Sequence, residues 1–153
     1  MKIGFSQTAE HTMSGSVGAD FPKRLSEAIH RHTACNYVCI PKEDGYVLKP
    51  SFRNMPYRNS FVPEVYIDIS RNNGQTALHL KGQPVKYVRI FMWVWIAFLL
   101  VMEVIFLAAS SEMDSLFPVF IPAVMVMFGY FLCAIATKAT FHAVVKAIRK
   151  EFP

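Results

Sequence analysis

The sequence contains no recognisable catalytic motif. It lacks a Gly-rich phosphate loop, a Gly-x-Ser-x-Gly elbow and a His-Glu-x-x-His pair. No pair of carboxylates stands on a recognisable scaffold either. We therefore expect a protein that is not an enzyme and that carries no cofactor.

A signal peptide and a disulfide framework are also missing. The first twenty residues lack the continuous apolar core of a signal peptide, so we expect the N-terminus to stay in the cytoplasm. Cysteine is scarce, with three residues, and Cys35 and Cys39 fall in this first part of the chain. Because disulfides rarely form in a reducing compartment, we expect free thiols.

Two long apolar stretches occupy the second half of the chain, at residues 90–109 and 116–137. Twenty helical residues extend over about 30 Å, the thickness of the hydrocarbon core of a bilayer. The linker 110–115 contains two acids and no base, and a linker this short joins antiparallel neighbours. The pattern predicts a transmembrane helical hairpin, with the lipid bilayer as its partner.

The basic residues predict the orientation of this hairpin. Seven of the sixteen Lys and Arg residues lie next to the apolar stretches, which explains part of the net charge of +5 without nucleic acid, and we expect no nucleic-acid partner. Cytoplasmic flanks of membrane helices are enriched in Lys and Arg. We therefore predict a multi-pass protein of the cell (inner) membrane with both termini in the cytoplasm. The flanking bases are Lys81, Lys86, Arg89, Lys138, Lys146, Arg149 and Lys150.

The chain divides into four predicted parts. A flexible N-terminus covers residues 1–19, and a cytoplasmic α+β domain covers 20–84. The transmembrane hairpin covers 85–137, and a basic amphipathic cytoplasmic helix covers 138–153. The apolar stripe of that last helix can lie on the inner leaflet or cover a sheet. We favour the sheet, because a small sheet needs a covering layer.

Local patterns predict the elements of the α+β domain. Asp20, followed by apolar residues at helical spacing, predicts a capped helix that reaches His32. The segments YVCIP and YVLKP flank the turn KEDG, which predicts a β-hairpin. Alternating residues on both sides of an Asn-Gly turn at 73–74 predict a second hairpin. The fold class is thus a membrane α+β protein with a small antiparallel sheet.

His30, His32, Cys35 and Cys39 are the densest group of metal-ligand side chains in the sequence. Their spacing matches no standard zinc pattern, and two histidines two positions apart on a helix point in different directions. We favour a polar helix end followed by cysteines on one strand, and we predict no metal.

An aromatic-Arg-Asn repeat occurs twice between residues 52 and 59. It contains Phe52, Arg53 and Asn54, followed by Tyr57, Arg58 and Asn59. Two guanidinium groups can bind phosphate or carboxylate, on a lipid headgroup or on a protein. The simpler interpretation is a Pro-bounded connection with solvated arginines. Arg53, Asn54, Tyr57, Arg58 and Asn59 are our candidate contact residues for a partner or a headgroup.

The segment YRNSFVP, followed by a β-hairpin, two spans and a basic tail, resembles a group of small bacterial two-span membrane proteins. The resemblance covers residues 45–152 and rests on this one motif and the common layout. The group has no known activity, so it implies no function. It favours a bacterial inner membrane.

Glu103 is the one ionisable residue inside the predicted spans. Such residues are candidates for function because burial in lipid is costly. The sequence therefore leaves two hypotheses, and a membrane-resident immunity or regulatory protein that acts on a toxin or enzyme cannot be separated from the first of them. The first is a membrane-anchored accessory or interaction protein that presents a cytoplasmic domain at the inner leaflet. The second is a homo-oligomeric channel or transporter subunit that uses Glu103.

Overall fold

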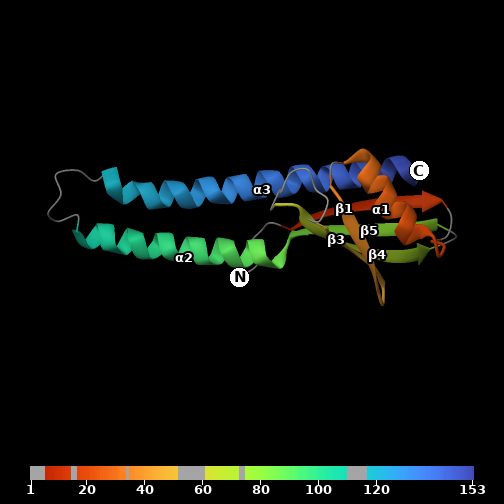
Figure 1. Cartoon of the computed structure of the whole chain (residues 1–153), viewed down its shortest axis with the longest axis horizontal. Helices are drawn as coiled ribbons and strands as arrows, with labels where there is room; N and C mark the ends of the chain where they lie inside the picture. Colours follow the sequence, from red (N-terminus) through yellow and green to blue (C-terminus); the bar gives the residue numbers. More distant parts are fainter. Residues whose placement is uncertain (1–5, 15–16, 34, 52–60, 73–74, 110–116) are drawn as a thin grey trace. The chain divides into compact units, whose positions relative to one another are not determined.

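The computed structural model describes residues 6–14, 17–33, 35–51, 61–72, 75–109 and 117–153. The elements are β1 (Gln7–Ser14), α1 (Phe21–His32), β2 (Tyr37–Lys42), β3 (Gly45–Pro50), β4 (Pro63–Asn72), β5 (Gln75–Pro84), α2 (Lys86–Ala109) and α3 (Phe117–Glu151), as Figure 1 shows. They form two compact units. The sheet unit comprises Met1–Val85 and Ala136–Pro153, and the helical unit comprises Lys86–Ile135.

The sheet unit contains a five-stranded sheet in the order β1-β5-β4-β3-β2. All of its pairings are antiparallel. The two predicted hairpins are both present, as β2–β3 and β4–β5, and α1 ends at His32 as predicted. The predicted α+β class with an antiparallel sheet is therefore confirmed.

One face of this sheet is covered by helices. In β5, Thr76, Leu78 and Leu80 are buried, whereas the alternating His79 and Lys81 are exposed. Alternation of this kind places one set of side chains in the core and the other in solvent. The same core contains residues from α1 and from the last part of α3, namely Phe21, Leu25, Ile29, Phe141, Val144, Val145, Ala147, Ile148 and Phe152. The expectation that the C-terminal amphipathic helix covers the sheet is confirmed.

The structure corrects the expectation of a flexible segment over residues 1–19. Residues 7–14 form β1, which pairs with β5 over its whole length, from Gln7 opposite Gly82 to Ser14 opposite Gln75. Ala9 and Met13 are the apolar side chains that β1 directs toward the core. The strand was missed because its remaining inward positions are polar, which removes the usual hydrophobic alternation.

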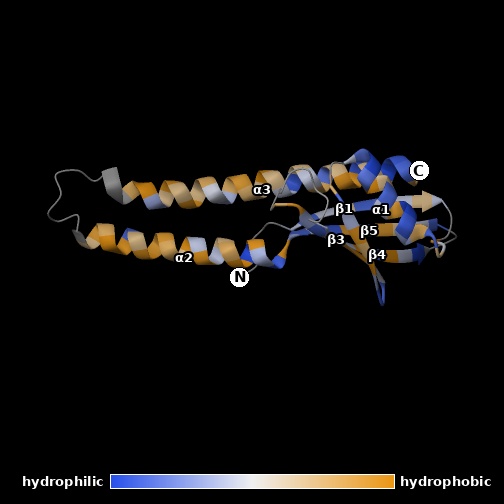
Figure 2. Ribbon diagram, viewed as in Figure 1, coloured by the Kyte–Doolittle hydropathy of each residue, from blue (hydrophilic) through white to orange (hydrophobic). Residues whose placement is uncertain are grey.

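The helical unit consists of α2 and the first part of α3, which lie side by side (Figure 1). Trp95 and Gly129 mark the contact, because a Cβ atom added at Gly129 would lie 3.6 Å from Nε1 of Trp95. Val88, Met92 and Leu99 are buried on one face of α2. The residues between Lys86 and Ala108, and those from Phe120 onward in α3, are long and apolar enough to cross a membrane, by length and composition (Figure 2).

The two helices differ from the predicted spans in their limits. The helix α2 begins at Lys86 instead of residue 90. The helix α3 does not end near residue 137 but continues without interruption to Glu151. The predicted second span and the predicted C-terminal helix are therefore one helix, because the change from apolar to basic residues at Lys138 alters the surroundings of a helix without breaking it.

Candidate functional site

The predicted histidine and cysteine group lies around the C-terminal end of α1. The helix ends where Thr33 adopts an extended backbone, and the Thr33 hydroxyl donates to the Ile29 carbonyl at 2.7 Å. The Cys35 amide in turn donates to Thr33 Oγ1 at 3.3 Å. These bonds satisfy groups that a helix end leaves without intrahelical partners, and they turn the chain toward β2.

This turn separates the four predicted ligands. His30 and His32 are exposed, whereas Cys35 and Cys39 are half-buried and pack against the core of the sheet unit. Within the described part of the chain, no three His, Cys, Asp or Glu side chains are grouped so that they could hold a metal ion.

The protonation of the two thiols also argues against a metal site. Burial raises the pKa of the Cys35 thiol, and burial raises that of Cys39 to about 11. Burial, with a smaller contribution from Cys35, likewise raises the pKa of Tyr37, whose hydroxyl donates to the Pro63 carbonyl at 3.0 Å. Because the thiolate is the form that binds metals and attacks electrophiles, these cysteines behave as small core residues at neutral pH.

The candidate contact residues Arg53, Asn54, Tyr57, Arg58 and Asn59 lie outside the described residues. The elements on both sides of this stretch are described. It joins the end of β3 to the start of β4, where Val62 is fully buried and Pro63 pairs with Pro84. Pro84 is also the last residue of β5, and α2 follows it in the chain. The residue that follows the candidate stretch into β4, Pro63, therefore lies at the same end of the sheet as the end of β5.

Glu103 lies in α2, four positions after Leu99 and therefore on the buried face of the helix. Its side chain is half-buried, and its Oε2 atom is buried without a hydrogen-bond partner among the described residues. Thr137 Oγ1 in α3 has the same status. A buried carboxyl group without a partner is energetically costly, which keeps Glu103 a candidate for function.

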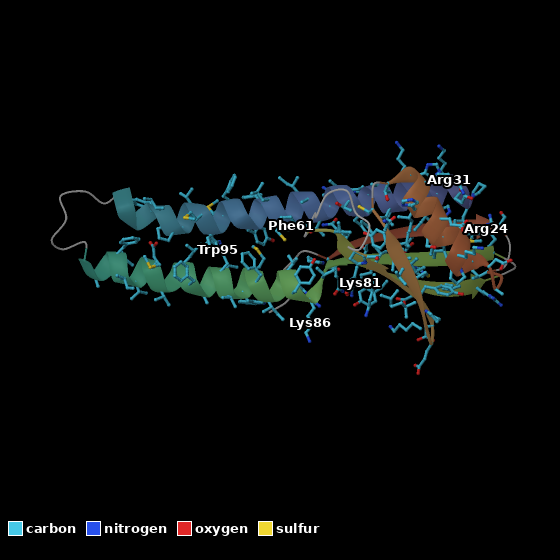
Figure 3. The ribbon with its side chains drawn as sticks, viewed as in Figure 1. Arg24, Arg31, Phe61, Lys81, Lys86 and Trp95 are labelled. Carbon is cyan, nitrogen blue, oxygen red and sulfur yellow. The ribbon has the colours of Figure 1, made fainter. Side chains whose placement is uncertain are left out.

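A cluster that the sequence did not reveal holds the C-terminal end of α3 in the sheet unit. The Phe152 ring lies 5.0 Å from the Phe21 ring, and the Arg24 guanidinium lies 5.2 Å from the Phe152 ring centre. Arg31 pairs with Glu151 at 3.4 Å (Figure 3 labels both arginines). A cavity of about 220 Å³ opens beside Arg24 and Phe152. No local pattern predicts contacts between residues so far apart in the chain.

His11 adds another contact to this end, because its Nε2 lies 2.5 Å from the Phe152 carbonyl oxygen. Arg149 also donates to the Glu10 carbonyl at 3.2 Å. The cluster thus joins α1, β1 and α3. No protein-family model, curated protein or solved structure matches the chain.

Proposed function

We propose that this chain is a membrane-anchored accessory or interaction protein. In this proposal α2 and the first part of α3 cross the bilayer as a hairpin, and the sheet unit is presented at the inner leaflet. The observation that carries it is the exposure of the apolar helices. Only 11% of the apolar window of α2 and 17% of that of α3 is buried.

This exposure distinguishes membrane helices from the core helices of a water-soluble protein. Phe91 is 60% exposed, Val104 66% and Phe128 65%. Moving one large apolar side chain out of water is worth about 1.5–3 kcal/mol, so a long row of them strongly favours a lipid surrounding. The sheet unit, by contrast, has its own buried core, which supports a soluble part next to an embedded part.

The charged residues support the proposed orientation. Lys86 and Arg89 are exposed in the first turn of α2, and Lys138 is exposed in α3 directly after the apolar stretch. The connection between the two helices contains acids and no base. Basic residues at one end of a hairpin favour placing that end in the cytoplasm.

Cysteine labelling of intact bacterial cells tests this orientation. A membrane-impermeant maleimide should label a Ser111→Cys variant without lysis, because residue 111 is in the predicted outer loop. A Lys150→Cys variant, altered at an exposed position of the sheet unit, should be labelled only after lysis. The reverse pattern would overturn the orientation, and protection of both positions would overturn the hairpin.

The proposed contact surface for a partner is the stretch around Arg53 and Arg58. We expect an Arg53→Ala/Arg58→Ala variant to lose a specific set of membrane partners. Partners are crosslinked to the chain, the chain is purified, and the proteins attached to it are compared by quantitative mass spectrometry. The matched control is Lys42→Ala/Lys49→Ala, which removes the same charge from exposed positions of the sheet unit. An unchanged set in the arginine variant, or an equal loss in both, would contradict this surface.

A second candidate function is a homo-oligomeric channel or transporter subunit. The unpartnered Oε2 atom of Glu103 favours it, because intramembrane acids mark ion and proton paths. However, Glu103 lies on the buried face of α2, so a shared pore would require the hairpin to repack. Conductance that is unchanged in a Glu103→Gln variant, or a strictly monomeric state in detergent, would remove this candidate.

A further inference from the structure

The exposed face of α2 begins with two cations. Lys86 and Arg89 are three positions apart, so they lie on the same side of the helix, and both are exposed. Glu103 is the one acid in α2, and it lies on the buried face of the helix. The exposed face is therefore purely cationic at its start and carries no compensating acid.

The same face continues as an apolar stripe. With 3.6 residues per turn, Ile90, Trp93 and Ala97 lie in line with Lys86, and Leu100, Val101 and Val104 follow. Ile90 is 53% exposed and Trp93 is 45% exposed. Figure 3 shows Lys86 on the side of α2 turned away from α3, and Trp95 on the side that faces it.

We infer that this face of α2 is a binding site for one anionic phospholipid. Lys86 and Arg89 bind the headgroup phosphate, Trp93 lies at the level below the headgroup, and the acyl chains lie along Ile90, Ala97 and Leu100. The inference rests on the proposed membrane function, and it adds to that function the chemical class of the bound lipid.

The chemistry of the face selects this occupant. Lys and Arg are the side chains that bind phosphate oxygens, and Arg adds a two-pronged donor geometry. Indole rings favour the boundary between headgroups and acyl chains. A zwitterionic lipid offers the same phosphate but brings its own cation, which Lys86 and Arg89 repel. An acidic peptide would match the two cations but not the apolar stripe below them.

The tryptophans provide a direct assay, because Trp93 and Trp95 are the two in the chain. A Trp95→Phe variant of the full chain retains Trp93 as the single fluorophore, with an aromatic ring kept between Phe91 and Phe98. The variant is reconstituted in phosphatidylcholine vesicles that contain a small fraction of phosphatidylglycerol brominated on its acyl chains. Quenching of Trp93 fluorescence by brominated phosphatidylglycerol is compared with quenching by brominated phosphatidylcholine. The ratio of the two gives the lipid preference at this face of α2.

We expect phosphatidylglycerol to be preferred over phosphatidylcholine, and we expect Lys86 and Arg89 each to increase this preference by about fivefold. The preference should fall by about fivefold in Lys86→Gln or Arg89→Gln, and it should nearly vanish in the double variant. The matched control is Lys146→Gln/Lys150→Gln, which removes the same charge from exposed positions of the sheet unit and should leave the preference unchanged.

The outcomes separate the two proposals. Equal quenching by both lipids, or an equal loss of preference in the control, would overturn the phospholipid site while leaving the membrane hairpin intact. No quenching by either lipid would place Trp93 outside the bilayer, which would overturn the proposed membrane function itself. Circular dichroism of each variant confirms that the helices are retained.

Discussion

The packing of Phe141 over Gly82 gives the sharpest test of how α3 covers the sheet. Gly82 faces the core near the end of β5, and Phe141 lies on α3 with 1% of its surface exposed. A Cβ atom added at Gly82 would lie 2.4 Å from Cδ2 of Phe141. Real Cβ contacts are not this short, so Gly82→Ala requires the ring or the strand to move.

The magnitude follows from this lack of space. Overpacking of a filled core costs about 1–3 kcal/mol. With a urea dependence of about 1–3 kcal/mol per molar, we expect the unfolding midpoint of the sheet unit to fall by about 1 M. Gly18→Ala is the matched control, because no atom lies within 4 Å of a Cβ added there, and it should leave the midpoint unchanged.

Cys39 reports on this unfolding, because it packs against the core of the sheet unit. The full chain in detergent is incubated in increasing urea, alkylated briefly, and digested. Mass spectrometry of the peptide that contains Cys39 then gives the fraction unfolded. This readout avoids the tryptophans, which both belong to the helical unit.

A double-mutant cycle tests the assigned cause. Phe141→Ala alone should cost about 3–5 kcal/mol, since it leaves a cavity. In the Phe141→Ala background the clash is absent, so Gly82→Ala should cost nothing there. If Gly82→Ala has no effect in the native chain, or the same effect with and without the ring, the packing of α3 on β5 is not as described.

Two other predictions concern the same unit. Because burial raises the pKa of Cys39 to about 11 from 9.0, the folded state keeps a proton that the unfolded state loses. The contribution of this thiol to the stability should be complete below about pH 9 and should disappear as the pH rises toward 11, measured by urea unfolding followed by circular dichroism. Cys39→Ala should lose less stability over this range, and the remaining loss comes from Cys35 and Tyr37, whose pKa values burial also raises. Gly45→Ala should destabilise the β2–β3 hairpin by more than about 1 kcal/mol, because the added Cβ would lie 2.0 Å from the Ile67 carbonyl oxygen. Gly18→Ala should cause no such loss, and urea unfolding followed by circular dichroism measures both variants.

Local signals were sufficient for part of this fold. The helix α1 and the β4–β5 hairpin were predicted because their apolar periodicity and turn residues lie close together in the sequence. For α1 the predicted cap was only partly right: Asp20 occupies the N-cap position, but its side chain makes no capping hydrogen bond, and Pro22 provides the preformed first turn. The amphipathic face, more than the cap, determines this helix.

The remaining features depend on contacts that no local pattern encodes. The strand β1 carries few apolar residues and exists through its pairing with β5, some seventy positions away. The position of Glu103 on the buried face of α2 likewise depends on which side of that helix packs, and the sequence left this open. The thiols of Cys35 and Cys39 were candidate ligands by spacing, and their burial against the core is a tertiary property.

The sheet unit is discontinuous in the chain, and this discontinuity connects its folding to the proposed membrane insertion. Residues 20–84, the predicted domain, lack both β1 and the part of α3 that supplies Phe141, Val144 and Ile148 to the core. Those residues are synthesised after both apolar helices. The sheet unit therefore reaches its complete buried core only once the segments proposed to enter the membrane have been made.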